Sequence, residues 1–139
     1  MKKFEQFHDG FYNGLRIEGK SVALFLETFA NERHVLLATG VVALRSDEIR
    51  AGNIVFDVVL LTANEIGLAE IREVYGLDDG EQDESDAQRF LAKAQEEGSS
   101  FLTITPSYGG SSFVLAKAFA FMGESQWLAK PTMGTTVVE

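Results

Sequence analysis

Apolar and polar residues alternate over the first third of the chain, and this period of two predicts β-strands. The range 11–18 alternates in this way and is followed by Gly19-Lys20. Glycine as the first of two loop residues is typical of a type II′ hairpin turn. The sequence therefore predicts an antiparallel hairpin of strands 11–18 and 21–29, with a third strand over 33–39.

The middle of the chain has a different pattern. The range 40–52 predicts an irregular connection, with one helical turn near 46–48. The following range, 53–62, reads NIVFDVVLLT and is apolar on both faces except at Asp57. A strand of this kind is typical of the centre of a sheet that other elements cover.

Two helices are predicted after this strand. Thr62 and Glu65 have capping-box spacing, and the apolar stripe that follows continues to about Tyr75. A second capping box begins at Ser85, and Gly98 supplies the C-terminal stop of its helix.

Strands over 101–105 and 113–122 complete the predicted elements, and the turn-rich stretch PSYGGSS joins them. Four strands thus precede the helix pair and two follow it. We expect a single α+β domain over 1–139. Its mostly antiparallel sheet should have about six strands, with two helices inserted after the fourth strand and packed on one face.

The composition narrows the function classes. The chain has 139 residues, of which 45% are hydrophobic and 24% charged, as in ordinary globular proteins. It has no cysteine, and its formal charge of −9 argues against nucleic acid or anionic lipid as a partner. No apolar run approaches the ~20 residues of a membrane-spanning helix. We expect a cytoplasmic protein without a cofactor.

His8-Asp9 is the first candidate for chemistry, because imidazole and carboxylate both bind divalent cations. Only one other histidine, His34, occurs in the chain, so the pair is a weak metal motif. The simpler interpretation is that Asp9-Gly10 makes a turn and that His8 donates a hydrogen bond to a backbone carbonyl or a carboxylate. No metal site is predicted.

Asp57 is the second candidate, because a carboxylate among apolar neighbours must face water, find a partner or have its pKa raised. His8 is a possible partner. Such a pair could serve as a general acid and base, or it could be a structural hydrogen bond, and both interpretations stay open.

Two further stretches do not match known functional motifs. The acidic tract 78–86 fails the EF-hand template, because Glu84 stands where the loop glycine should be. A solvated loop between two helices explains it more simply. PSYGGSS contains no nucleophile elbow, and no nucleotide-binding loop occurs anywhere in the chain.

The order FHDG, EGKSV, GVVAL, GNIVFDV and PSYGGSSFVLA resembles a set of small, mostly uncharacterised bacterial proteins, some of which look like immunity proteins that neutralise partner toxins. The resemblance spans residues 7–120. It implies an α+β fold and no agreed catalytic residues. The positions that match are His8, Asp9, Gly10, Ser107, Tyr108 and Gly109.

These observations favour a non-catalytic protein-binding domain, immunity-protein-like in role. One alternative is a small-ligand-binding domain with a pocket beneath PSYGGSS. The other is a small hydrolase or isomerase that uses His8 and Asp57 as its acid/base pair. The expected binding residues are His8, Asp9, Asp57, Ser107, Tyr108 and Gly109.

The predicted strand pattern also bears on oligomeric state. A sheet of short antiparallel strands has open edges, and strand 113–122 carries a single charge, Lys117. A homodimer would cover such an edge, with Trp127, Val137 and Val138 adding apolar contact. Alternatively, the tail folds back on its own subunit and leaves a monomer.

Overall fold

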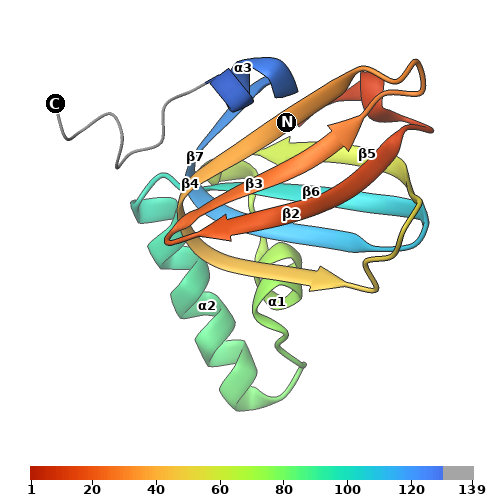
Figure 1. Ribbon diagram of the computed structural model, residues 1–139. Helices are drawn as coiled ribbons and strands as arrows, with labels where there is room; N and C mark the ends of the chain where they lie inside the picture. Colours follow the sequence, from red (N-terminus) through yellow and green to blue (C-terminus); the bar gives the residue numbers. More distant parts are fainter. Residues whose placement is uncertain (130–139) are drawn as a thin grey trace, which may run out of the picture.

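The computed structural model describes residues 1–129 and shows a closed antiparallel β-barrel (Figure 1). The strands follow the order β1-β5-β2-β3-β4-β7-β6, and β5 also pairs with β6. That last pairing closes the sheet on itself, with β1 as an extra strand beside β5. The open sheet expected from the sequence is therefore wrong.

The strands are β1 (Lys2–Lys3), β2 (Phe11–Glu18), β3 (Ser21–Glu27), β4 (Arg33–Asp47), β5 (Asn53–Leu61), β6 (Ser100–Tyr108) and β7 (Ser111–Gly123). The α-helices are α1 (Leu68–Tyr75), α2 (Glu81–Glu96) and α3 (Glu124–Ala129). Single 3₁₀ turns lie at Glu5–Phe7 and Ala63–Glu65.

The barrel closes around β5. Its pairing with β6 runs from Leu61 opposite Phe101 to Ile54 opposite Tyr108. On its other side, only Ile54 and Asn53 pair with β2. The chain before β2 continues that side, because Val55 exchanges backbone hydrogen bonds of 3.0 Å with residues 9 and 10. Local sequence patterns carry no information on such distant pairings, which is why closure was not predicted.

Side chains fill the barrel interior, as expected for a small barrel. Phe7, Leu24, Leu102 and Ile104 are fully buried there. Tyr12 also points inward, and its hydroxyl lies 2.8 Å from the Ser112 Oγ. The remaining buried members are Phe4, Val22, Leu26, Leu36, Ala38, Val55, Val58, Val114 and Ala116.

Helices α1 and α2 pack against the outside of the barrel (Figure 1). Ile71 and Val74 of α1 and Ala87 and Ala94 of α2 are buried in a second apolar cluster with Phe101 and Leu115. The two helices follow β5, which is the fifth strand of the chain once β1 is counted, and not the fourth. Gly76 ends α1 at φ +67°, the left-handed geometry that favours glycine.

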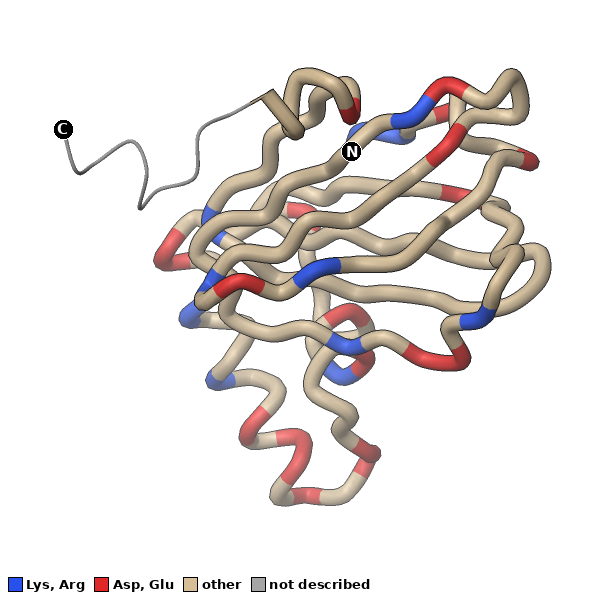
Figure 2. Tube along the Cα trace, viewed as in Figure 1, with Lys and Arg blue, Asp and Glu red and all other residues tan. Residues whose placement is uncertain are grey.

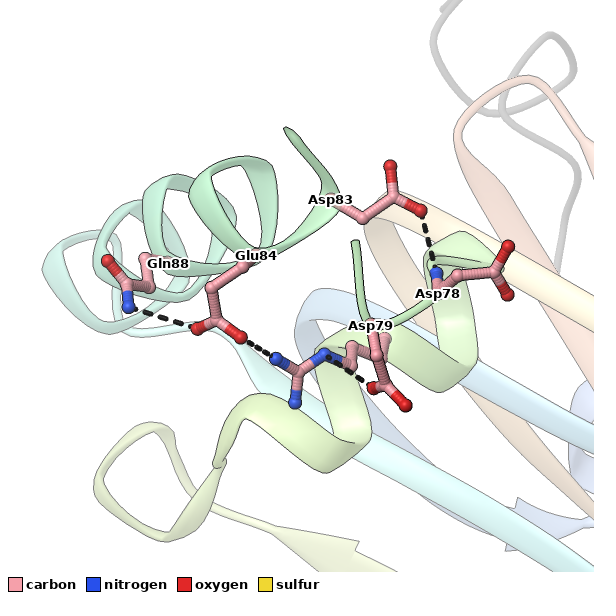
Figure 3. A network of polar contacts seen from close by, with 6 residues as sticks. Asp78, Asp79, Asp83, Glu84 and Gln88 are labelled. Carbon is pink, nitrogen blue, oxygen red and sulfur yellow. Dashed lines mark hydrogen bonds and ion pairs between the residues drawn. The ribbon is translucent and has the colours of Figure 1, made fainter. Parts of the chain in front are cut away.

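The acidic tract is mostly helical. Helix α2 begins at Glu81 and not after Ser85, so the expected loop over 78–86 is shorter than predicted. Figure 3 shows how its carboxylates are used. Asp83 accepts the backbone N–H of Asp78 at 2.7 Å, and Glu84 accepts from Gln88 at 3.0 Å and pairs with Arg72.

Two predicted connections are strands instead. β4 continues through Gly40, which takes φ +63° beside a β-bulge, so the irregular connection expected over 40–52 is confined to 48–52 and the helical turn near 46–48 is wrong. The stretch PSYGGSS belongs almost entirely to β6 and β7, and only Gly109 and Gly110 lie between these strands.

The C-terminal helix covers its own barrel. Trp127 of α3 lies edge-on to Phe25 of β3, with 5.3 Å between ring centroids. β7 pairs with β4 from Ser111 to Gly123 but with β6 only from Ser112 to Ala116, so among the described strands residues 117–122 have a partner on one side only. Val137 and Val138 lie outside the described residues. None of the helices in residues 1–129 has the length and apolar character needed to cross a bilayer.

Candidate functional site

The His-Asp-Gly stretch forms a turn before β2. Asp9 takes φ +63°, and a Cβ on Gly10 would collide with the backbone oxygen of Glu27. His8 Nδ1 donates a hydrogen bond to the Phe56 carbonyl oxygen at 2.9 Å. The structural interpretation of this stretch is confirmed: a turn at Asp9-Gly10, and a histidine that donates to a backbone carbonyl.

A surface hollow lies beside this turn. Its volume is about 320 Å³, within the range of small-ligand sites. It is lined by Lys3, Phe4, Glu5, His8, Phe56 and Asp57. β5 contributes Phe56 and Asp57, and the chain leading into β2 contributes the rest. The structure thus brings His8 and Asp57 to one site.

Asp57 has Lys3 and not His8 as its partner. The Lys3 Nζ lies 3.2 Å from Asp57 Oδ1, because β1 pairs with β5 and sets Lys3 opposite Val59. His8 Nε2 is 3.7 Å from Asp9 Oδ2. Within residues 1–129 no hydrogen bond joins His8 to Asp57, so the two do not form an assembled acid/base pair. Lys3 is a site residue that the sequence did not indicate.

Large apolar side chains are exposed next to the hollow. Phe56 is 48% exposed and Tyr108 53% exposed. Tyr108 pairs with Ile54, two residues before Phe56 along β5, and the register between these strands shifts at Ser107 and again at Phe56. Ile49, 41% exposed, lies close to Gly110 in the adjoining turn. The Arg50 guanidinium lies 5.8 Å from the centre of the Tyr108 ring. We call these four residues, Ile49, Arg50, Phe56 and Tyr108, the aromatic surface.

Of the three positions expected in PSYGGSS, only Tyr108 has a clear place in this surface. Ser107 is exposed on β6. Gly109 has a structural role, because it takes φ +88° and a Cβ there would collide with Asn53 Oδ1. The Asn53 side chain lies directly against this turn, because its Oδ1 accepts the backbone N–H of Gly110 at 2.8 Å.

Asn53 was missed at the sequence level, although a polar residue that opens an apolar strand was a usable signal. It is 1% exposed. Its Oδ1 accepts the backbone N–H groups of Arg50 at 2.9 Å and Gly110 at 2.8 Å. Its Nδ2 donates to the backbone oxygens of Tyr12, at 3.1 Å, and of Arg50. The amide therefore fixes the turns that present Arg50 and Tyr108.

Charge is distributed unevenly around the molecule. Figure 2 shows acidic residues along the α1–α2 connection and the first turns of α2, at the lower end of the view.

In the barrel, burial raises the pKa of Tyr12, and its hydrogen bonds to Ser112 and Ser46 oppose this shift. Among residues 1–129, no group of three His, Asp or Glu side chains is arranged to hold a metal ion.

Comparison of the chain with protein-family models, with curated proteins and with solved structures gives no significant match. The function is therefore inferred from the hollow and the aromatic surface.

Proposed function

We propose that this protein is a non-catalytic protein-binding domain that contacts its partner through the aromatic surface. The observation that carries this proposal is the exposure of Phe56 on β5 and of Tyr108 on the paired strand β6, with Arg50 over the tyrosine ring. Exposed Tyr, Phe and Arg side chains are the types most enriched at protein interfaces and among their energetic hot spots.

The rigidity of the surface supports the same proposal. Tyr108 pairs with Ile54 at the end of β6, and the carbonyl of Phe56 on β5 accepts the hydrogen bond from His8 Nδ1 at 2.9 Å. The turns beside them are fixed by Asn53. A surface held in this way loses little conformational entropy when a partner binds. The resemblance to immunity-like proteins, which act by binding another protein, agrees with it.

The proposed partner is a different protein and not a second copy of the chain. The homodimer expected from the sequence needed an open edge over 113–122, and β6 already pairs with part of that range, residues 113–116. Each copy also carries a formal charge of −9, which opposes self-association.

Affinity capture with matched variants tests the proposal. Wild-type protein, Tyr108→Ser and Ile17→Ser are immobilised, and lysate of the source organism is passed over each. Ile17 is a suitable control because it is 60% exposed and lies near the opposite end of β2 from Phe11. We expect one stoichiometric protein on the wild type and on Ile17→Ser, and at least a tenfold loss on Tyr108→Ser. Equal capture by all three proteins, or none by the wild type, contradicts the proposal.

A further inference from the structure

We propose that the hollow beside Phe56 receives an arginine side chain of the protein partner. This inference rests on the proposed function, and it names the chemistry that the partner must present. Phe56 belongs both to the aromatic surface and to the lining of the hollow, so one partner would contact both.

The charges of the lining select a cation. Lys3 is the one ammonium, and Asp57 already pairs with it at 3.2 Å. Glu5 is the second carboxylate and makes no ion pair with any residue that the structure describes. Among the lining residues there are thus two carboxylates and one ammonium, while the Lys2 ammonium is not part of the lining and lies over the Phe4 ring. The formal charge of −9 on the whole chain also attracts a basic segment.

The aromatic groups of the lining suit a guanidinium. The His8 ring is held in place, because its Nδ1 donates to the Phe56 carbonyl and its Nε2 lies 3.7 Å from Asp9 Oδ2. The Phe56 ring forms an exposed wall over which a cation can lie. The buried Phe4 ring already has the Lys2 ammonium 4.9 Å from its centre.

Arginine matches this set better than lysine does. Its planar guanidinium can stack on a ring while its five N–H groups bond to several acceptors. Glu5 and Asp57 supply carboxylate acceptors in the lining. A lysine ammonium is a compact point charge that gains less from the ring face.

Titration of the isolated protein with small probes tests the inference. N-acetyl-arginine amide is added to ¹⁵N-labelled protein at low salt, and amide shifts are followed by NMR. N-acetyl-citrulline amide, the neutral analogue, and N-acetyl-lysine amide are added to matched samples. We expect saturable shifts at His8 and Phe56 with the arginine probe, and at least fivefold weaker binding of the other two. Absence of saturable shifts, or equal binding of citrulline or lysine, overturns the inference.

Variants locate the site. Glu5→Gln and Asp57→Asn should each weaken the arginine probe at least threefold, whereas Glu96→Gln, an exposed change on α2, should leave it unaltered. Glu5→Gln is decisive, because it breaks no ion pair among residues 1–129. Unchanged binding in Glu5→Gln refutes the inference. If the wild type captures a partner that Tyr108→Ser loses, but the arginine probe does not bind, only the proposal for the hollow is refuted. If the arginine probe binds but no partner is captured, only the proposal for the aromatic surface is refuted.

Discussion

The Asn53 Oδ1 accepts the backbone N–H of Gly110 at 2.8 Å, across 57 residues of sequence. The same side chain also bonds to the backbone of Tyr12 and of Arg50. One buried amide therefore joins β2, the start of β5 and the β6–β7 turn, which are the segments that close the barrel and carry the aromatic surface. Its four hydrogen bonds use both the donors and the acceptor of the amide, as a buried polar group requires.

Asn53→Ala should strongly destabilise the protein. The change leaves the Gly110 N–H and the Tyr12 carbonyl without their partner in a buried site, and we expect a loss of about 3 kcal/mol. Urea denaturation followed by circular dichroism measures it. Asn64→Ala, at an exposed position, should change the free energy of unfolding by less than about 0.5 kcal/mol. Similar losses of unfolding free energy in the two variants would show that the Asn53 hydrogen bonds do not contribute to stability.

Gly110→Ala should cost about 1–3 kcal/mol through overpacking. A Cβ at this position would lie 2.7 Å from the Ile49 Cα and 2.8 Å from the Asp47 backbone oxygen, and neither backbone atom can easily move away. Asn64→Ala again serves as the control, because Asn64 is exposed and lies outside this turn. Thermal unfolding should show a lower Tm for Gly110→Ala alone, and an unchanged Tm would mean that the turn adapts.

The Tyr12 hydroxyl makes stability dependent on alkaline pH. Burial raises its pKa in the folded state, so the unfolded chain ionises first as the pH rises above about 10. Above this pH, unfolding therefore releases a proton from the Tyr12 hydroxyl. The free energy of unfolding then falls as the pH rises toward the pKa of Tyr12 in the folded state. Tyr12→Phe should be less stable by about 1 kcal/mol at pH 7. Above about pH 10, the wild type should lose stability faster with rising pH than Tyr12→Phe does. Parallel pH profiles would contradict this account.

Glu84 should contribute more to stability than its neighbour Glu81, although both lie in the first turn of α2. Glu84 pairs with Arg72 of α1 and accepts from Gln88, whereas Glu81 is exposed. We expect Glu84→Gln to cost about 0.5–1 kcal/mol at low salt and less in 1 M NaCl, because salt screens the ion pair. Glu81→Gln should show neither effect in urea denaturation. Equal costs for both variants would show that charge near the helix terminus, and not the Arg72 contact, is responsible.

The sequence predicted elements where the local pattern was strong. β2, β3 and β5 match the alternation or the apolar run expected for them within two residues at each end. Other boundaries depended on tertiary contacts. Gly40 suggested a strand end, but packing on β7 carries β4 seven residues further, to Asp47. Ser85 suggested a helix start, but the helix begins earlier, at Glu81.

The site was predicted in part. His8, Asp57 and Tyr108 do lie along β5, because the turn before β2 borders one side of that strand and β6 pairs with the other. The Lys3–Asp57 ion pair was not predicted, since it depends on β1 pairing far along the chain. Barrel closure was missed for the same reason: an alternating pattern shows which face is buried but not which strand lies next to it.

Photo-cross-linking tests most directly whether the aromatic surface binds a protein. p-Benzoylphenylalanine is placed at position 108 in one variant and at position 17 in another, and each is irradiated in lysate of the source organism. We predict one dominant adduct of a different protein at position 108 and none at position 17. No adduct at 108, the same adduct at both positions, or an adduct near twice the 15.3 kDa mass of the chain that contains only this protein would contradict the account.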